Sequence, residues 1–329
     1  MKLKTKFVSA LTLAKVKFLK KRIPLAVRWQ LTNRCPSRCL YCNLWQKPSP
    51  ELSTSQVFSI LDELAQMGTK RISFSGGEPT VRDDLGKIID YTHKLGISPS
   101  INTCGVKVPE KIKELKNLDL MKISIDGPRE VDNKVRGRKE AFDWAISAAE
   151  AAKKEGIKFT FCTTLTRYNL SSLKWMVNLA RKYKTMVAFQ PLKTIYRGVE
   201  DIHRLYPSKE EWHKAIEELR SLKKKYPQNI RNSFLLLDHI QNWPNYKKIP
   251  CWAGKIFCII DVDGSVVPCD RVDYPTKNIP NAVKLGFKEA FKKMPEAKCS
   301  GCGFCGAMEL NFLLAGKLGV LQELRILLG

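Results

Sequence analysis

Long apolar runs are absent from this sequence of 329 residues. No uninterrupted apolar stretch approaches the ~18 residues that a membrane-spanning helix needs, which excludes a polytopic membrane protein. Low-complexity segments are also missing, as are internal repeats beyond a strand–helix alternation. With 44% hydrophobic and 27% charged residues, the chain is not disordered, collagenous or a coiled coil. Its length suits one large domain or two ordinary ones.

Acidic residues are few, because 32 Asp and Glu stand against 57 Lys and Arg, a formal net charge of +25. Such an excess indicates an anionic partner, an anionic surface or a tolerance of self-repulsion. Nucleic acid, acidic lipid and an acidic peptide all fit, as does a general enrichment in lysine. The lysines are spread along the chain and no RNA-binding module is recognisable, so no specific nucleic acid is indicated.

Short β-rich runs alternate with helical patterns along the first 230 residues. The sequence predicts strands at 25–31, 71–75, 97–102, 121–126, 158–165 and 186–190, and helices at 55–66, 85–94, 109–116, 139–155, 171–183 and 209–226. This alternation is typical of parallel strands with helices packed outside. A closed eight-unit barrel takes ~250 residues, so six units predict an α/β fold, a partial (β/α)6 TIM-like barrel or an open sheet. Ligands are then expected at the carboxyl ends of the strands.

Histidine is scarce, with four residues, whereas the eleven cysteines are clustered. Cys35, Cys39 and Cys42 lie directly after the first predicted strand. Three thiolates cannot close a four-ligand tetrahedral site, but a cubane iron–sulfur cluster held by three Cys keeps one iron open. A zinc site completed by a distant residue is the alternative, although no His or further Cys follows closely enough in sequence to complete it.

The segment from Cys35 to Cys42, with Tyr41 before its last cysteine, resembles the C-x3-C-x2-C signature of the radical S-adenosylmethionine (SAM) superfamily. Ser75-Gly76-Gly77-Glu78-Pro79 follows the second predicted strand and is similar to the family's GGEP motif, which binds the methionine amino group. Glycine lets a backbone approach a ligand, and a carboxylate suits an ammonium partner. The resemblance covers roughly residues 24 to 200 and implies that SAM is bound by Tyr41, Gly76, Gly77 and Glu78.

Ser124 and Asp126, at the end of the fourth predicted strand, point to the same face because they lie two residues apart. The resemblance implies that they contact the ribose or the methionine carboxylate of SAM. Asn102-Thr103 is similar to the family's Thr-Asn-Gly, in altered order and with Cys104 inserted. Arg136-Gly137 also resembles a recurring family stretch, and a solvated surface charge is the alternative for Arg136.

A second group of cysteines comprises Cys251, Cys258, Cys269, Cys299, Cys302 and Cys305. The spacing of Cys251, Gly264 and Cys269 is similar to the SPASM/twitch extension of the same superfamily, which binds auxiliary iron–sulfur clusters. Asp263-Gly264 predicts a tight hairpin turn between 257–262 and 265–268. Two fully ligated cubanes need eight Cys and this group has six, so we expect one auxiliary [4Fe–4S] cluster.

The expected ligands of the auxiliary cluster are Cys251, Cys269 and two of the last three cysteines, which are Cys299, Cys302 and Cys305. Cys258 is an alternative candidate for one of these ligand positions. A second, incompletely ligated cluster and a zinc ribbon are the alternatives. Cys104 and Cys162 fall on predicted barrel strands and are expected to be core thiols.

The predicted organisation is a basic amphipathic extension at 1–22, the barrel at 23–230, a connector at 231–249, the Cys-rich SPASM/twitch-like domain at 250–307 and an apolar C-terminal helix at 308–329. The extension lacks a clean cleavage site and is not expected to be a signal peptide. Both end segments suggest either binding to an anionic membrane or capping of the open barrel. Clustered Cys indicate a reducing compartment, so we expect a cytoplasmic protein, with peripheral attachment to the inner membrane surface as the alternative.

The resemblance implies an enzyme. Its cluster at Cys35, Cys39 and Cys42, reduced by a partner such as flavodoxin or ferredoxin, would donate one electron to SAM. The resulting 5′-deoxyadenosyl radical would abstract hydrogen from a substrate, while the auxiliary cluster accepts an electron or anchors the substrate.

The substrate class stays open between a peptide or protein side chain, a small metabolite, and a lipid or isoprenoid at a membrane surface. Only residues 1–22 precede the barrel, too few for a peptide-binding winged domain, which disfavours a leader peptide. A non-catalytic iron–sulfur or zinc protein is the alternative of another class.

Overall fold

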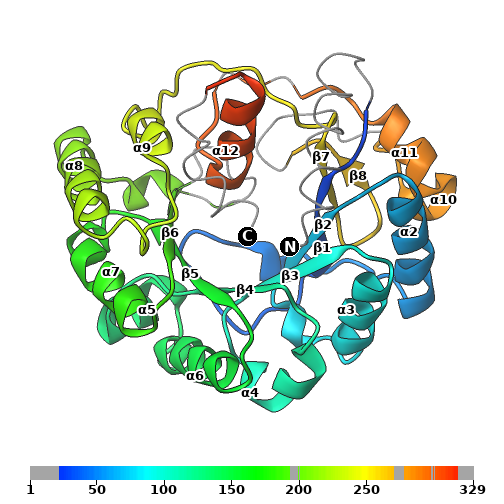
Figure 1. Cartoon of the computed structure of the whole chain (residues 1–329), viewed down its shortest axis with the longest axis horizontal. Coiled ribbons are helices and arrows are strands. Elements are labelled where there is room, and N and C mark those ends of the chain that lie inside the picture. Colours follow the sequence, from blue (N-terminus) through cyan, green and yellow to red (C-terminus); the bar gives the residue numbers. More distant parts are fainter. Residues whose placement is uncertain are drawn as a thin grey trace.

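Six parallel strands line the inside of the molecule, and helices surround them (Figure 1). This computed structural model describes residues 22–192, 199, 201–269, 278–297, 299 and 301–317. The strands are β1 (Ala26–Thr32), β2 (Arg71–Gly76), β3 (Ser98–Thr103), β4 (Leu120–Ser124), β5 (Phe159–Leu165) and β6 (Val187–Pro191). They stand in the sheet in sequence order, each parallel to the next. The predicted partial barrel is confirmed.

Most of the helices that cover the outer face lie close to their predicted positions. The outer helices are α2 (Thr54–Gln66), α3 (Leu85–Lys94), α4 (Val108–Lys111), α5 (Arg129–Arg136), α6 (Ala141–Lys154), α7 (Leu173–Lys182), α8 (Lys209–Lys225) and α9 (Phe234–Ile240). α5 was not predicted, because this helix buries Asp132 and Arg136 as well as Val135 and therefore shows no apolar period. α9 lies in the segment predicted as a connector. The helix predicted at 109–116 is divided into α4 and a 3-10 turn, Ile112–Leu115.

Side chains alternate sharply between the two faces of the sheet. One set of positions, such as Trp29, Phe74 and Ile123, is fully buried and packs into the main apolar core. The alternate positions are polar and half-buried, among them Arg28 on β1, Ser100 on β3 and Lys122 on β4. Because successive strand residues point to opposite faces, the polar set faces the inside of the barrel. The apolar set faces the helices.

The Cys-rich region continues the sheet of the barrel. Its hairpin consists of β7 (Phe257–Ile260) and β8 (Val266–Val267), which pair antiparallel, with a turn at Asp263-Gly264 as predicted. β7 also pairs in parallel with β1, so the sheet order ends in β2-β1-β7-β8. The remaining helices are α10 (Ala282–Leu285), α11 (Phe287–Lys293) and α12 (Cys305–Leu314). Figure 1 shows α12 in the gap between β6 and β7.

The end segments are only partly described. Residues 1–21 and 318–329 lie outside the described residues, and with them most of the predicted extension and of the apolar tail. In the described part of the tail, Met308, Phe312 and Leu314 of α12 are buried in internal packing. Across the described residues, no helix combines the length and apolarity needed to cross a membrane.

Candidate functional site

The first cysteine group lies in a compact loop at the carboxyl end of β1. Cys35, Cys39 and Cys42 are all half-buried. The guanidinium of Arg38 donates hydrogen bonds to the carbonyl oxygens of Cys35 (2.7 Å), Pro36 (3.2 Å) and Ser37 (2.9 Å). It also lies 4.0 Å from the ring centre of Trp45. One arginine therefore fixes the path of the backbone between the first two cysteines.

The glycine turn after β2 packs directly against this loop. The Gly77 N–H donates to the carbonyl of Thr32 (2.6 Å), and the Glu78 N–H donates to the carbonyl of Arg34 (2.8 Å). A Cβ on Gly77 would overlap the carbonyl oxygen of Arg34, and one on Gly76, whose φ is +122°, would overlap that of Thr32. The two glycines are thus required for the close approach of two backbones.

The opposite side of the loop is held by the end of α5. The N–H groups of Arg38 and Leu40 donate to the carbonyls of Arg136 and Val135, both at 2.9 Å. Gly137 adopts φ +65° after the helix, and a Cβ there would overlap the carbonyl oxygen of Arg38. The cysteine loop is therefore clamped through backbone contacts between the β2 turn and α5.

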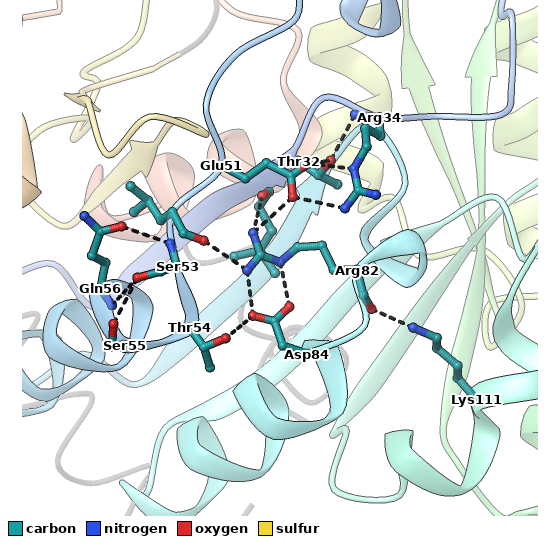
Figure 2. Close-up of polar contacts among 12 residues, drawn as sticks. Thr32, Arg34, Glu51, Ser53, Thr54, Ser55, Gln56, Arg82, Asp84 and Lys111 are labelled. Carbon is teal, nitrogen blue, oxygen red and sulfur yellow. Dashed lines mark hydrogen bonds and ion pairs between the residues drawn. The ribbon is translucent and has the colours of Figure 1, made fainter.

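A charged network supports the start of the loop (Figure 2). Glu51 forms an ion pair with Arg34 (2.8 Å) and accepts a hydrogen bond from the hydroxyl of Thr32. Arg82, which is 5% exposed, donates to the carbonyls of Leu31 and Leu52 and to both carboxylate oxygens of Asp84 (2.8 and 2.6 Å). The side chains come from segments far apart in sequence, and no sequence signal marked them.

Glu78 is a buried carboxylate that is already well bonded. It is 1% exposed. One oxygen accepts from the N–H and hydroxyl of Thr80 and from the hydroxyl of Thr103, and the other accepts from the N–H of Cys104 (2.6 Å). Glu78 thereby ties the β2 turn to the end of β3. The prediction that it binds an ammonium stays a prediction.

Asp126 is the centre of a second buried network. Its carboxylate accepts from the Tyr41 hydroxyl (2.9 Å) and from the N–H of Thr164 (2.8 Å), and it pairs with Arg136 (2.9 Å). Arg136 also pairs with Asp132, and burial raises the pKa of that carboxyl. Arg136 is 6% exposed, so a solvated surface charge is wrong for this residue. Tyr41 and Asp126 join the cysteine loop to β4.

The remaining predicted SAM contact, Ser124, lies at an inner position of the sheet, and so does Asn102 of the Asn102-Thr103 motif. Ser124 is the last residue of β4. Asn102 lies on β3, level with Lys122 of β4, and its buried Oδ1 has no hydrogen-bond partner in the structure. A buried polar atom without a partner on this inner face fits a polar ligand.

The three loop thiols also suit a cluster. They lie close enough to affect one another electrostatically, and burial raises the pKa of Cys35 to about 11 and of Cys39 to about 12. Because thiolates are the ligands of iron, loading these sites must release protons.

The second cysteine group surrounds a small cavity. Four of its thiols line this cavity, together with Asn311 of α12: they are Cys251, Cys269, Cys299 and Cys302. Asn311 is fully buried, its Oδ1 accepts from the N–H of Trp252 (3.1 Å), and its Nδ2 has no partner in the structure. An unused N–H donor beside four thiols fits a sulfur-rich group.

The other cysteines lie apart from this cavity. Cys258 is buried in β7, and burial raises its thiol pKa far above the ordinary value. The thiol of Cys305 donates to the carbonyl of Phe189 (3.2 Å) and contacts the main core. Cys104 is buried after β3, whereas Cys162 is half-buried on the inner face of β5 and is not a core thiol.

In the part of the chain that the structure describes, no three His, Cys, Asp or Glu side chains lie close enough to hold a single metal ion. The cysteine ligands of a cubane bind different irons, so they are spaced more widely than the ligands of one zinc ion.

Comparison with known proteins gives consistent matches. Residues 29–180 match the Radical SAM superfamily. Over 301 residues the chain is 30% identical to the mycofactocin maturase MftC of Mycolicibacterium smegmatis, which covers 86% of this chain and 76% of the maturase. Over 220 residues it is 32% identical to the Fe-coproporphyrin III synthase of Methanosarcina barkeri, which covers 64% of this chain and 55% of the synthase.

Solved structures show the same fold. The structure of Streptococcus suis SuiB bound to S-adenosylmethionine superimposes with a TM-score of 0.69 at 16% identity, covering 84% of this chain and 68% of SuiB. The structure of anSMEcpe with bound AdoMet superimposes with a TM-score of 0.62 at 20% identity, covering 82% and 80% of the two chains. At these identities the likeness concerns the arrangement of strands and helices.

Proposed function

Because the chain belongs to the radical SAM superfamily, we propose that it generates a substrate radical at the loop of Cys35, Cys39 and Cys42. As a member of the superfamily it is an enzyme that uses a [4Fe–4S] cluster and SAM. The chemistry that these groups supply is one-electron cleavage of SAM, which yields a 5′-deoxyadenosyl radical able to remove a hydrogen atom from a substrate. A low-potential reductant of the flavodoxin or ferredoxin kind provides the electron.

The protein's own contribution is positioning. The clamp on the cysteine loop is the observation that carries the proposal: backbone hydrogen bonds reach it from the β2 turn and from α5, with glycine at both contacts. Such a loop presents three thiols and leaves the space toward Ser124 and Asn102 for SAM. A cluster held by three Cys has an open iron for that ligand.

For the second cysteine group we propose one auxiliary [4Fe–4S] cluster, held by Cys251, Cys269, Cys299 and Cys302. The shared cavity and the unused Nδ2 of Asn311 support this set. The separate positions of Cys258 and Cys305 support leaving them out. In this place the cluster either accepts an electron from the substrate radical or anchors the substrate.

Anaerobic assay of 5′-deoxyadenosine tests the radical site directly. The reconstituted wild type, supplied with SAM and dithionite, is expected to release 5′-deoxyadenosine, and Cys39→Ala to release less than one hundredth of that amount. Cys258→Ala is the control, because it removes a thiol of β7 that lies outside both proposed ligand sets, and it is expected to keep the activity. Equal release from wild type and Cys39→Ala would refute the proposal.

A further inference from the structure

Two arginines meet where the cysteine loop packs against the end of α5. The guanidinium groups of Arg38 and Arg138 both donate a hydrogen bond to the carbonyl oxygen of Pro36, at 3.2 and 2.5 Å. Both side chains are half-buried. Pro36 directly follows Cys35, so the two positive charges are held one residue away from a proposed cluster ligand.

Two exposed lysines extend this group of cations. Lys134 lies in the last turn of α5, and Lys139 follows Arg138 in sequence. Asn133 folds the chain back onto the helix, because its carbonyl accepts the N–H of Arg138 (3.1 Å) and its side-chain amide donates to the carbonyl of Lys139 (2.5 Å). We call these four side chains the basic patch: Arg38, Lys134, Arg138 and Lys139.

The charge of the basic patch is not compensated by acidic side chains. Within the part of the chain that the structure describes, none of the four cations forms an ion pair. The segment 33–47, which contains the cysteine loop, has no Asp or Glu, and neither has the segment 133–139. Asp132 is fully buried and pairs with Arg136, while Glu140, the residue after Lys139, is exposed. The surface therefore carries a net positive charge.

An exposed aromatic ring lies beside the basic patch. Trp45 is 36% exposed, and the guanidinium of Arg38 lies 4.0 Å from its ring centre. Tryptophan and arginine are enriched among the residues that supply most of the binding energy at protein–protein interfaces. A positive surface with an exposed tryptophan fits an acidic protein partner, because complementary charge steers the encounter and the ring adds contact area.

The proposed reaction has a need for such a partner, since one electron must enter from outside for each cleavage of SAM. We propose that the basic patch, together with Trp45, docks an acidic one-electron carrier protein, and that the electron enters through Pro36 and Cys35. The carrier is oxidised by one electron, the cluster held by the three cysteines is reduced by one, and no bond forms or breaks. The inference rests on the proposed function, because it names the surface through which that site receives its electron.

The covalent path from this surface to the cluster site is short. The oxygen that both guanidinium groups contact belongs to Pro36, and only bonds of Pro36 and Cys35 separate it from the Cys35 thiol. The backbone of the loop is also fixed on this side, because the N–H of Arg38 donates to the carbonyl of Arg136 (2.9 Å). A carrier bound at the basic patch would thus contact a rigid part of the cysteine loop.

Stopped-flow reduction of the reconstituted holoprotein tests the docking surface. The bleaching of cluster absorbance is followed anaerobically after mixing with a reduced flavodoxin, an acidic carrier, at low ionic strength. Lys134→Glu/Lys139→Glu is expected to be reduced about tenfold more slowly than wild type, and added salt is expected to narrow this difference. Equal rates for the two proteins at low ionic strength would overturn the inference.

Lys153→Glu/Lys154→Glu is the matched control. These lysines are also exposed and lie in the last turn of a helix, α6, and Lys153 lies near a tyrosine ring as Lys134 does. They precede β5, however, and therefore lie toward the amino ends of the strands, away from the cysteine loop. We expect flavodoxin to reduce this variant at the wild-type rate. Equal slowing in both double variants would show an effect of total charge alone and would overturn the inference.

Binding measurements decide the outcome even if a variant holds its cluster poorly. Calorimetric titration with oxidised flavodoxin is expected to give an affinity about fivefold weaker for Lys134→Glu/Lys139→Glu than for wild type and the matched control. Unchanged affinity would contradict the inference. Unchanged affinity for flavodoxin combined with lost binding to vesicles of anionic phospholipid would assign the surface to a membrane instead.

Neither flavodoxin binding nor cluster bleaching requires cleavage of SAM. Protein that releases 5′-deoxyadenosine with dithionite, but takes up electrons from flavodoxin equally well without the basic patch, would overturn the docking surface alone. Protein that is reduced through the basic patch but releases no 5′-deoxyadenosine would overturn the proposed function alone.

Discussion

Arg136 shows how a single residue holds the cysteine loop from the interior of the protein. Its guanidinium forms ion pairs with Asp126 and Asp132 in the interior. Its backbone carbonyl accepts a hydrogen bond from the N–H of Arg38 in the loop. Asp126 in turn accepts a hydrogen bond from the hydroxyl of Tyr41. Two residues predicted to contact SAM, Tyr41 and Asp126, are thereby engaged with each other, and their binding roles stay predictions.

Removing Arg136 leaves two buried carboxylates without their cation, a change that typically costs about 3–5 kcal/mol. We therefore expect Arg136→Met to lower the free energy of unfolding in urea by about that amount. Arg129→Met is the matched control, because its pair with Asp143 is exposed to solvent on both sides, and a much smaller loss is expected. Similar losses of unfolding free energy in the two variants would show that the buried Arg136 network stabilises the protein no more than an exposed ion pair does.

Among the elements, α12 links the barrel to the Cys-rich region. The loop before it bonds to Gln190 of β6, whose amide donates to the carbonyl of Gly303 (2.6 Å) and accepts the N–H of Cys305 (3.0 Å). Farther along α12, Asn311 places its unused amide donor at the four-thiol cavity. The helix thus positions both the cysteines and a donor toward them.

A hydrogen bond from Asn311 to a cluster sulfur would favour the reduced form, because it stabilises added negative charge. If this hydrogen bond contributes about 1 kcal/mol, its loss changes the reduction potential of a one-electron couple by about 40 mV. We expect Asn311→Leu to lower the midpoint potential of the auxiliary cluster by about that amount in a redox titration followed by EPR. The exposed control Asn178→Leu is expected to show no change, and an unchanged potential in Asn311→Leu would exclude this hydrogen bond.

The buried ammonium of Lys122, on the inner face of the sheet, makes the stability of the protein depend on pH. The pKa of Lys122 lies near 8 in the folded protein against 10.5 ordinarily, so between these values the unfolded chain holds more protons and stability rises with pH. Below pH 8 the full cost of the buried charge is present. Lys122→Met, which lacks that cost, is expected to melt about 2 °C or more above wild type at pH 7 and to lose this advantage by about pH 10.5. A difference in melting temperature between Lys122→Met and wild type that stays constant across this pH range would contradict the lowered pKa of Lys122.

Strands and long helices were predictable from sequence because their apolar residues repeat at the period of the element. α3 has the predicted bounds, and each of the six barrel strands lies within two residues of its prediction. α5 was missed because it buries charge, and the networks of Arg82 and Arg136 were missed because their members meet only in the folded chain. Motif spacing located the cysteines, but only the fold separates Cys258 and Cys305 from the four that share a cavity.

At the scale of the whole molecule, the two cysteine groups belong to one continuous sheet. β1 leads into the first cysteine loop, and β7, which pairs with β1, contains Cys258 and leads to Cys269. The inner face of the barrel lies between these regions, with α12 across the remaining gap (Figure 1).

Anaerobic iron and sulfide analysis of reconstituted protein tests the central claim most directly. Wild type is expected to hold about eight irons, and the Cys35/Cys39/Cys42→Ala and Cys251/Cys269→Ala variants about four each, while Cys258→Ala and Cys305→Ala keep about eight. About four irons in wild type, falling to none in the first variant and accompanied by zinc, would contradict the account, because the second group would then be a zinc site.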